Sequence, residues 1–188
     1  MARTKLVVIS GSPGSGKTTL GAELGRRLDY PVIARDALKE VLLDAISAAN
    51  RQESMRLGAT SWNMMYAVLD VFIGHVPGVI VESNFSRGRS EPELLPRIER
   101  CQTVVIHCTA SWNVIEARIR AREGDPARHP GHFDRAALPE VKAAIDDGRF
   151  LPMHLPGATL VVNTSTGYEP TIDELLVEIQ RRGCGDWS

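Results

Sequence analysis

Residues 7–20, VVISGSPGSGKTTL, decide the fold. The stretch begins as a short apolar run, becomes rich in glycine, and ends in a helical pattern. Glycines let a backbone curl so that successive N–H groups point inward, which makes a nest for an anion at a helix N-terminus. A Gly-rich turn can match this pattern by chance. The apolar strand before it and the helix after it favour a phosphate-binding loop, or P-loop.

The loop offers side chains as well as backbone N–H groups. Lys17 supplies a mobile positive charge for the β- and γ-phosphates of a nucleotide, and the Thr18 hydroxyl is suited to bind Mg²⁺. We therefore expect ATP and Mg²⁺ here, with Lys17 acting in catalysis and Thr18 as the metal ligand. The loop residues expected to contact nucleotide are Gly11, Ser12, Pro13, Gly14, Ser15, Gly16, Lys17, Thr18 and Thr19.

Five short apolar runs predict a parallel sheet. They are rich in Val and Ile, lack alternation with polar residues, and are separated by helical patterns, which is typical of strands covered on both faces. The expected strands are 5–10, 31–34, 78–83, 103–108 and 158–163, and the expected helices are 17–28, 37–48, 54–75, 90–99, 111–122, 137–147 and 170–182. This alternation predicts one three-layer α/β domain over residues 1–188.

Composition limits the possible partners. Of 188 residues, 43% are apolar and 24% charged, and the formal net charge is -1, so no global attraction to nucleic acid or to an anionic membrane is expected. The three cysteines lack CxxC spacing, which disfavours a disulfide framework or a zinc site. No apolar run approaches the length of a membrane span. We expect a cytoplasmic protein with no membrane partner.

A second informative stretch is SWNVIEARIRAREGDPARHPGHFD, residues 111–134. Trp112, Ile115 and Ile119 share one helix face, which we expect to pack on the sheet. Arg118 and Arg122 lie four residues apart on a neighbouring face, so both can meet the charge that spreads over a phosphoryl group in transfer. Residues 123–136 contain few apolar side chains, which predicts a mobile lid over the phosphates. Within it, Arg128 is a candidate substrate contact. For His129 and His132 the sequence leaves two alternatives open: each contacts substrate or has no functional role.

Two strand ends carry candidate acceptor residues. In PVIARDALKE, residues 31–40, Asp36 is either the N-cap of a helix or the base that takes a proton from a substrate hydroxyl, and Arg35 is a candidate substrate contact. Residue 39 is Lys, so no reciprocal capping box forms. In GVIVESNF, residues 78–85, Glu82, Asn84 and Phe85 follow a buried run. They are candidates for the acceptor site, because functional groups collect at the carboxyl ends of such strands.

With these motifs in place, the chain resembles the small P-loop kinases of the nucleoside-monophosphate-kinase-like class. More narrowly, it resembles the AAA_33 or zeta-toxin-like ATP-binding group, which includes relatives of polynucleotide 5′-hydroxyl kinase and chloramphenicol phosphotransferase. The motifs that carry this resemblance are GSPGSGKTTL at 11–20, ARD at 34–36, VESNF at 81–85, EARIRAR at 116–122 and RHPGH at 128–132.

The resemblance implies a single kinase-like domain with a parallel sheet in the order 2-3-1-4-5, bound ATP and Mg²⁺, a lid near 123–136, and an acceptor side formed by the helical region 37–75. It implies that Arg118 and Arg122 contact adenine and phosphate. It also implies that Asp36, as the acid of an Arg-Asp pair after the second strand, is a general base. The acceptors of this group are diverse, so the substrate does not carry over.

Three functions remain open from the sequence. The favoured one is an ATP-dependent kinase for a small hydroxyl compound. A GTPase is disfavoured, because VVNTSTG at residues 161–167 contains no Asn-Lys-x-Asp motif. A polynucleotide 5′-hydroxyl kinase would need a more basic surface than this composition provides. A regulatory or toxin-like protein that binds nucleotide with little turnover is the third possibility.

Overall fold

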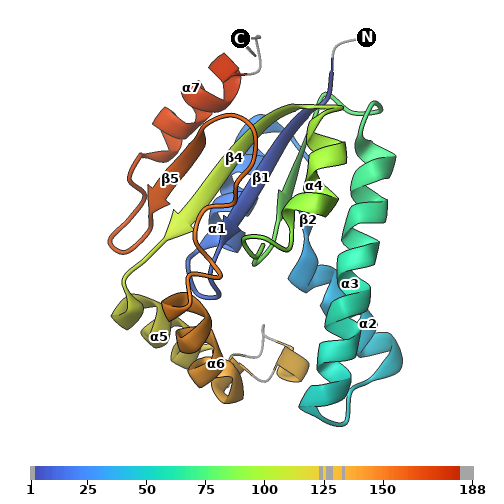
Figure 1. The fold of residues 1–188 in the computed structure, drawn as a ribbon, viewed down its shortest axis with the longest axis vertical. Coiled ribbons are helices and arrows are strands. Elements are labelled where there is room, and N and C mark those ends of the chain that lie inside the picture. Colours follow the sequence, from blue (N-terminus) through green and yellow to red (C-terminus); the bar gives the residue numbers. More distant parts are fainter. Residues whose placement is uncertain (1–2, 123–124, 126–128, 133, 183–188) are drawn as a thin grey trace.

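A computed structural model of the chain describes residues 3–122, 125, 129–132 and 134–182. A parallel sheet in the order β2-β3-β1-β4-β5 forms its centre, as Figure 1 shows. The predicted strand order is therefore confirmed. The strands are β1 (Lys5–Gly11), β2 (Val32–Ala34), β3 (Gly78–Glu82), β4 (Gln102–Thr109) and β5 (Thr159–Asn163).

The connecting helices agree with the predicted ones to within a few residues at each end. They are α1 (Lys17–Leu28), α2 (Arg35–Ile46), α3 (Arg51–Phe72), α4 (Glu91–Ile98), α5 (Trp112–Ala121), α6 (Asp134–Asp146) and α7 (Ile172–Arg182), with a short 3₁₀ turn, η1 (Pro130–His132), before α6. Among the described residues, every helix is too short or too polar to cross a membrane.

Alternate side chains of the strands point to opposite faces of the sheet and build two cores. On one face, Leu6 and Val8 of β1 pack with Met65 and Leu69 of α3 and with α4. On the other face, residues such as Ile9 pack with α1 and α7. Each fully buried aliphatic side chain of this kind contributes about 1.5–3 kcal/mol to stability. The two cores fix the sheet, and its carboxyl edge carries the loops of the site.

The helix after β4 packs in a different place from the one we expected. The sequence suggested that the face of Trp112, Ile115 and Ile119 lies on the sheet, but Ile115 and Ile119 are buried against Leu138 of α6. The two helices form a separate small core beyond the ends of β1 and β4, opposite α2 and α3 in Figure 1. This arrangement leaves the carboxyl edge of the sheet between two helical pairs.

The structure decides two local questions about α2 and α3. Of the two roles that the sequence left open for Asp36, the capping role is excluded: helix α2 begins at Arg35 with Ala34 as its N-cap, so Asp36 lies inside the first turn. In α3, Tyr66 belongs to the core and is 7% exposed. Asn63 is exposed at the surface. The buried stripe is wider than strict helical spacing suggests, because α3 packs both on the sheet and on α4.

Candidate active site

The P-loop between β1 and α1 is curled against its neighbours without room for side chains. Gly11 has φ +141°, and a Cβ on it would lie 2.4 Å from the carbonyl oxygen of Cys108. Gly14 packs on α5, where a Cβ would meet Ile115 at 3.1 Å. Gly16 ends the loop as the N-cap of α1, with φ 81°. These positions need glycine because L side chains are disfavoured at positive φ and would collide here.

Lys17 lies folded into the loop. Its Nζ donates to the carbonyl oxygen of Ser12 at 2.9 Å, and only 6% of the residue is exposed. Burial lowers the pKa of Lys17, because removing an ammonium from water disfavours its charged form, while the carboxylates of Glu82 and Asp36 act in the opposite direction. The arrangement holds a weakly solvated cation beside the anion nest.

Glu82, at the end of β3, faces the first turn of α1. The Thr18 hydroxyl donates to its Oε1 at 3.1 Å, and Glu82 is 2% exposed. Burial raises the pKa of this carboxyl, and the charge of Lys17 partly offsets that effect. A hydroxyl and a carboxylate this close offer the hard oxygen donors that Mg²⁺ prefers. Among the described residues, no group of three or more His, Cys, Asp or Glu side chains is placed to hold a metal ion.

A cavity of about 350 Å³ opens in front of the loop. Its phosphate half is formed by the P-loop and its neighbours: Pro13, Gly14, Gly16, Lys17, Thr18, Thr19, Glu82 and Arg122. Its acceptor half comes from the start of α2, the end of β3 and the chain around η1: Arg35, Asp36, Lys39, Ser83, Asn84, Asp125 and His132. Topology brings these segments together, because β2, β3 and β1 are neighbours whose carboxyl ends meet at one edge.

Asp36 reaches the cavity from the first turn of α2. Its carboxylate pairs with Arg35, Nη2 to Oδ1 2.7 Å, and 30% of the Asp36 side chain remains exposed. The guanidinium of Arg35 lies over the Trp62 ring at 5.0 Å from the centroid. This stacking fixes Arg35, and Arg35 in turn holds the Asp36 carboxylate. The structure thus gathers the predicted pair at the cavity, without the capping role.

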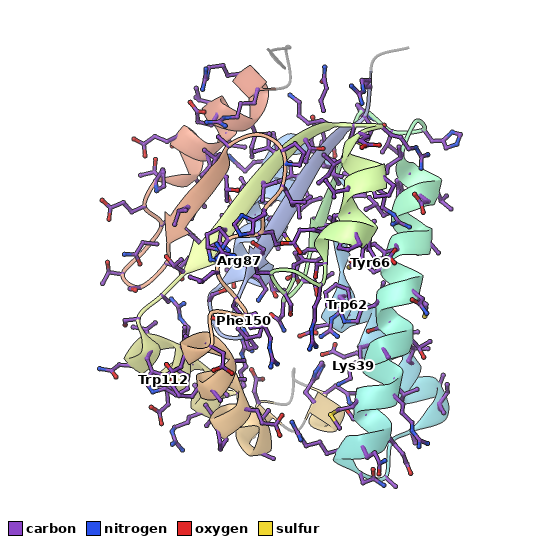
Figure 2. The ribbon with its side chains drawn as sticks, in the orientation of Figure 1. Lys39, Trp62, Tyr66, Arg87, Trp112 and Phe150 are labelled. Atoms are coloured by element: carbon purple, nitrogen blue, oxygen red, sulfur yellow. The ribbon has the colours of Figure 1, made fainter. Side chains whose placement is uncertain are left out.

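Lys39 is a cavity residue that motif reasoning missed. It lies one turn after Asp36 on α2 and is 8% exposed. Its aliphatic stem passes over Gly58 of α3, where a Cβ would be 3.8 Å from Cε. Figure 2 shows Lys39 below Trp62, both beside α3. The signal in the sequence was the i, i+3 spacing from Asp36, which places both side chains on one helix face.

A second cavity, about 440 Å³, adjoins the first on the other side of the P-loop. It is lined by Gly16, Thr19, Arg118, Ala121, Arg122, Thr164, Gly167 and Tyr168. Gly16, Thr19 and Arg122 border both cavities, so Arg122 lies at the junction between them.

Arg118 is tied into the framework more tightly than we expected. Its Nη1 donates to the Gly14 carbonyl at 3.2 Å and to Thr164 Oγ1 at 3.0 Å, and its Nη2 donates to the Thr164 carbonyl at 2.5 Å. Thr164 is 2% exposed and donates its own hydroxyl to the Ser15 carbonyl at 2.9 Å. Arg118 and Thr164 therefore join α5, the loop after β5 and the P-loop. The sequence analysis did not identify Thr164 as part of the site, because no motif around residue 164 indicates contacts with Ser15 and Arg118.

Within 123–136, the segment predicted to be a lid, the described residues 129–132 rest on α2 and α3. His132 pairs with Glu40, Nε2 to Oε1 2.7 Å, and His129 lies 3.2 Å from Asp44. Ser54 donates to the Gly131 carbonyl at 2.6 Å. His132 borders the cavity, whereas His129 does not line it. Arg128, a predicted substrate contact, lies outside the described residues.

The prediction that Phe85 belongs to the acceptor site is wrong. It is 1% exposed, belongs to the core on the α3 side of the sheet, and does not line the cavity. The Trp62 ring covers it at a centroid distance of 5.4 Å. The backbone turns after Ser83 so that Asn84 faces the cavity and Phe85 faces the core. Arg120 also behaves as expected for a surface residue, paired with Glu116 on α5.

The strand order, the P-loop and the two adjoining cavities define the class of P-loop NTPases with a kinase-like fold. The AAA_33 family model, described as an AAA domain, matches residues 6–147, and the chain belongs to this family. No curated protein sequence matches the chain.

Solved structures extend the similarity over nearly the whole chain. A protein from Chloroflexus aurantiacus J-10-fl described as a candidate kinase is 30% identical, with a TM-score of 0.79 over 95% of this chain and 98% of that one. A sugar kinase from Janibacter sp. HTCC2649 is 17% identical, with a TM-score of 0.58 over 97% and 99%. Shikimate kinase from Acinetobacter baumannii is 13% identical, with a TM-score of 0.53 over 97% and 96%. The last two show likeness of fold alone.

Proposed function

We propose that the protein is a kinase that transfers the γ-phosphate of ATP to a hydroxyl group of a small molecule. The observation that carries the proposal is that Lys17 and Asp36 line the same cavity of about 350 Å³. A P-loop alone serves many functions. A carboxylate facing it across a cavity of this size suits a reaction in which a hydroxyl must lose a proton as it attacks a phosphate.

The proposed reaction is an in-line displacement. The acceptor oxygen forms a bond to the γ-phosphorus, the bond from that phosphorus to the β–γ bridging oxygen breaks, and ADP leaves with that electron pair. Asp36 takes the proton of the hydroxyl, and Arg35 holds its carboxylate at 2.7 Å. Two cations stabilise the negative charge of the phosphoryl group in the transition state. One is Lys17, which Ser12 holds, and the other is Arg122 at the junction of the two cavities.

Thr18 and Glu82 are the residues that would hold Mg²⁺. Their oxygens already lie 3.1 Å apart, and the buried carboxylate gains a counter-charge when a cation shares it. The ion would neutralise the charge that builds up on the phosphates.

Asp36→Asn is the experiment that tests the base. We expect turnover to fall by about 10²–10⁴-fold, because that is the usual contribution of a general base. The dissociation constant for ATP should stay within about twofold, since Asp36 lies in the acceptor half. Turnover is measured as ADP release and ATP affinity by calorimetry, with Asp44→Asn on the exposed side of α2 as the matched control. Full turnover in Asp36→Asn excludes the base assignment.

A further inference from the structure

Arg35 and Asp36 are consecutive residues, and this limits what their ion pair can do on its own. Both side chains leave the first turn of α2, and Arg35 Nη2 lies 2.7 Å from Asp36 Oδ1. An ion pair joins two side chains, but it does not place them, because two flexible side chains on one turn can move together. A contact outside α2 is needed to give the pair a fixed position in the cavity.

The ring of Trp62 on α3 supplies such a contact. Among the described residues, the guanidinium of Arg35 makes one ion pair, with Asp36, and one ring contact, with Trp62 at 5.0 Å from the centroid. Its Nε is buried and has no hydrogen-bond partner within the described part of the chain. Indole is the ring that attracts a cation most strongly. Trp62 therefore ties Arg35 to a second helix.

The Trp62 ring is held in turn from the side of the core. Phe85, which is 1% exposed, lies 5.4 Å from it and Tyr66 lies 6.0 Å from it, measured between ring centroids. Arg97 of α4 lies over the Tyr66 ring at 4.6 Å and pairs with Asp70 at 2.7 Å. Figure 2 shows Tyr66 and Trp62 one after the other along α3. A ring packed among core side chains has little freedom to rotate, so it can serve as a support.

We infer that Trp62 is a positioning residue: its ring fixes the Arg35 guanidinium, and Arg35 fixes the Asp36 carboxylate that takes the proton. The inference rests on the proposed function, because it takes Asp36 as the base. Trp62 is not among the described residues that line the cavity, and it takes no part in bond making. It acts on the rate because a base must stay within hydrogen-bond distance of the hydroxyl.

The kinetic test is a double-mutant cycle of Trp62→Leu and Asp36→Asn. The readout is kcat for ADP release, with the best acceptor from a panel of gluconate, shikimate, glycerol and cytidine. Leucine fills part of the space but offers no ring face to the guanidinium. We expect Trp62→Leu to lower kcat by about 10–100-fold when Asp36 is present, since a misplaced base loses its effect. In the Asp36→Asn background, the same change should alter kcat by less than about twofold.

A residue with a merely structural role gives a different result in this cycle. Trp62→Leu would then leave kcat unchanged, or would lower it by the same factor in both backgrounds. Either result overturns the inference, and so does an effect confined to KM for the acceptor.

Two further variants separate positioning from general damage. Trp62→Phe keeps a ring face beside Arg35 and should retain kcat within about threefold. Trp112→Leu is the matched control, because Trp112 is also partly buried and lies under a cation, Lys142 at 5.6 Å, but does not line either cavity. It should leave kcat within about twofold. A Trp62→Phe protein as slow as Trp62→Leu, or an equal loss in Trp112→Leu, would count against the inference.

A second cycle needs no turnover. Urea unfolding of Trp62→Leu, Arg35→Met and the double variant measures how far the ring and the guanidinium depend on each other. We expect the two losses to depart from additivity by about 2–30-fold in the equilibrium constant for unfolding, which is the range for a cation over a ring. Additive losses would show that Trp62 does not anchor Arg35.

The two cycles keep this inference apart from the proposed function. If the wild-type protein phosphorylates none of the compounds, the kinase proposal fails, and if Asp36→Asn keeps full turnover, the base assignment fails. The unfolding cycle then still decides whether Trp62 anchors Arg35. If the wild-type protein is active and Asp36→Asn is slow, a Trp62→Leu protein with full kcat contradicts the positioning role alone.

Discussion

The two halves of the main cavity are built in different ways. The phosphate half is formed mostly by backbone that one continuous segment places, with glycines fitted against Cys108 and Ile115. The acceptor half is formed by side chains that come from α2, the end of β3 and the chain around η1. Backbone geometry cannot be altered by substituting one exposed side chain, whereas a side-chain wall can change residue by residue. In this chain, the wall of the acceptor half can therefore be changed by single substitutions more readily than the P-loop.

The largest expected effect comes from a substitution in the phosphate half of the cavity. Lys17→Ala should lower kcat by about 10³–10⁵-fold, because it removes a cation that faces the transferring group in a site shielded from water. ADP release at saturating ATP measures the loss. Lys142→Ala, which removes an exposed lysine on α6, should leave kcat within about twofold. A Lys17→Ala protein that still turns over at a tenth of the wild-type rate would contradict this role.

Next in size is the contrast between the two lid-helix arginines. Arg122 borders both cavities, so Arg122→Ala should lower kcat by about 10²-fold with little change in stability. Arg118 is bonded to Gly14 and Thr164, so Arg118→Ala should act mainly on stability and on KM for ATP. Steady-state kinetics together with urea unfolding separate the two. Arg120→Ala serves as the surface control, and equal kcat losses in Arg118→Ala and Arg122→Ala would show that the contrast is wrong.

Thr164→Val tests how much the hydrogen bonds between the P-loop and the loop after β5 contribute to stability. Valine keeps the shape but removes the hydroxyl that Ser15 and Arg118 share. We expect a loss of about 1–3 kcal/mol in the free energy of unfolding, since buried partners lose their hydrogen bonds. Urea denaturation measures it, with the exposed Thr166→Val in the same loop as control. If both variants were equally stable, the hydrogen bonds of Thr164 would make no contribution to the free energy of unfolding.

The smallest expected effect concerns pH. His107 of β4 is 3% exposed and shares a hydrogen bond with Ser10, Oγ to Nδ1 2.9 Å. Burial, with a smaller contribution from Lys17 and Arg87, lowers the pKa of His107 to about 4. Between about pH 6.5 and pH 4 the unfolded chain therefore binds a proton that the folded one does not, so stability falls as pH falls.

This group should account for about 2 kcal/mol of the stability lost between pH 7.5 and pH 5. Urea unfolding at the two pH values checks it. His107→Gln should reduce the pH dependence by that amount, whereas His75→Gln at the exposed surface should not. An unchanged pH dependence in His107→Gln would locate the proton uptake elsewhere.

Short sequence patterns predict those features whose residues lie close together in the chain, namely the strands and the P-loop. The strands and the P-loop follow from apolar runs and from one motif, because strand burial and positive φ constrain the residue type directly. The order of the strands came from the family resemblance. The cap of α2 could not be decided from the sequence, since the choice between Ala34 and Asp36 depends on how the chain leaves β2. Helix ends are often shifted in this way.

The acceptor wall and the Arg118 link lie beyond such patterns. Phe85 and Asn84 are adjacent in sequence but face the core and the cavity respectively, and only the turn after β3 decides which does which. Lys39 depends on Gly58 for its path, and Thr164 meets Ser15 from 149 residues away. These contacts follow from tertiary packing. No short window of sequence contains both partners.

Gly58 has a consequence for how acceptor choice can change. A methyl group at this position would touch Arg35 and Lys39 at ordinary contact distance, 3.8 Å, so alanine fits. A longer side chain would occupy the path along which the stem of Lys39 runs, and both cations would have to move. A single substitution at position 58 of α3 is therefore expected to change the shape and charge of the cavity beside α2 without touching the P-loop. For protein engineering, position 58 is the natural starting point.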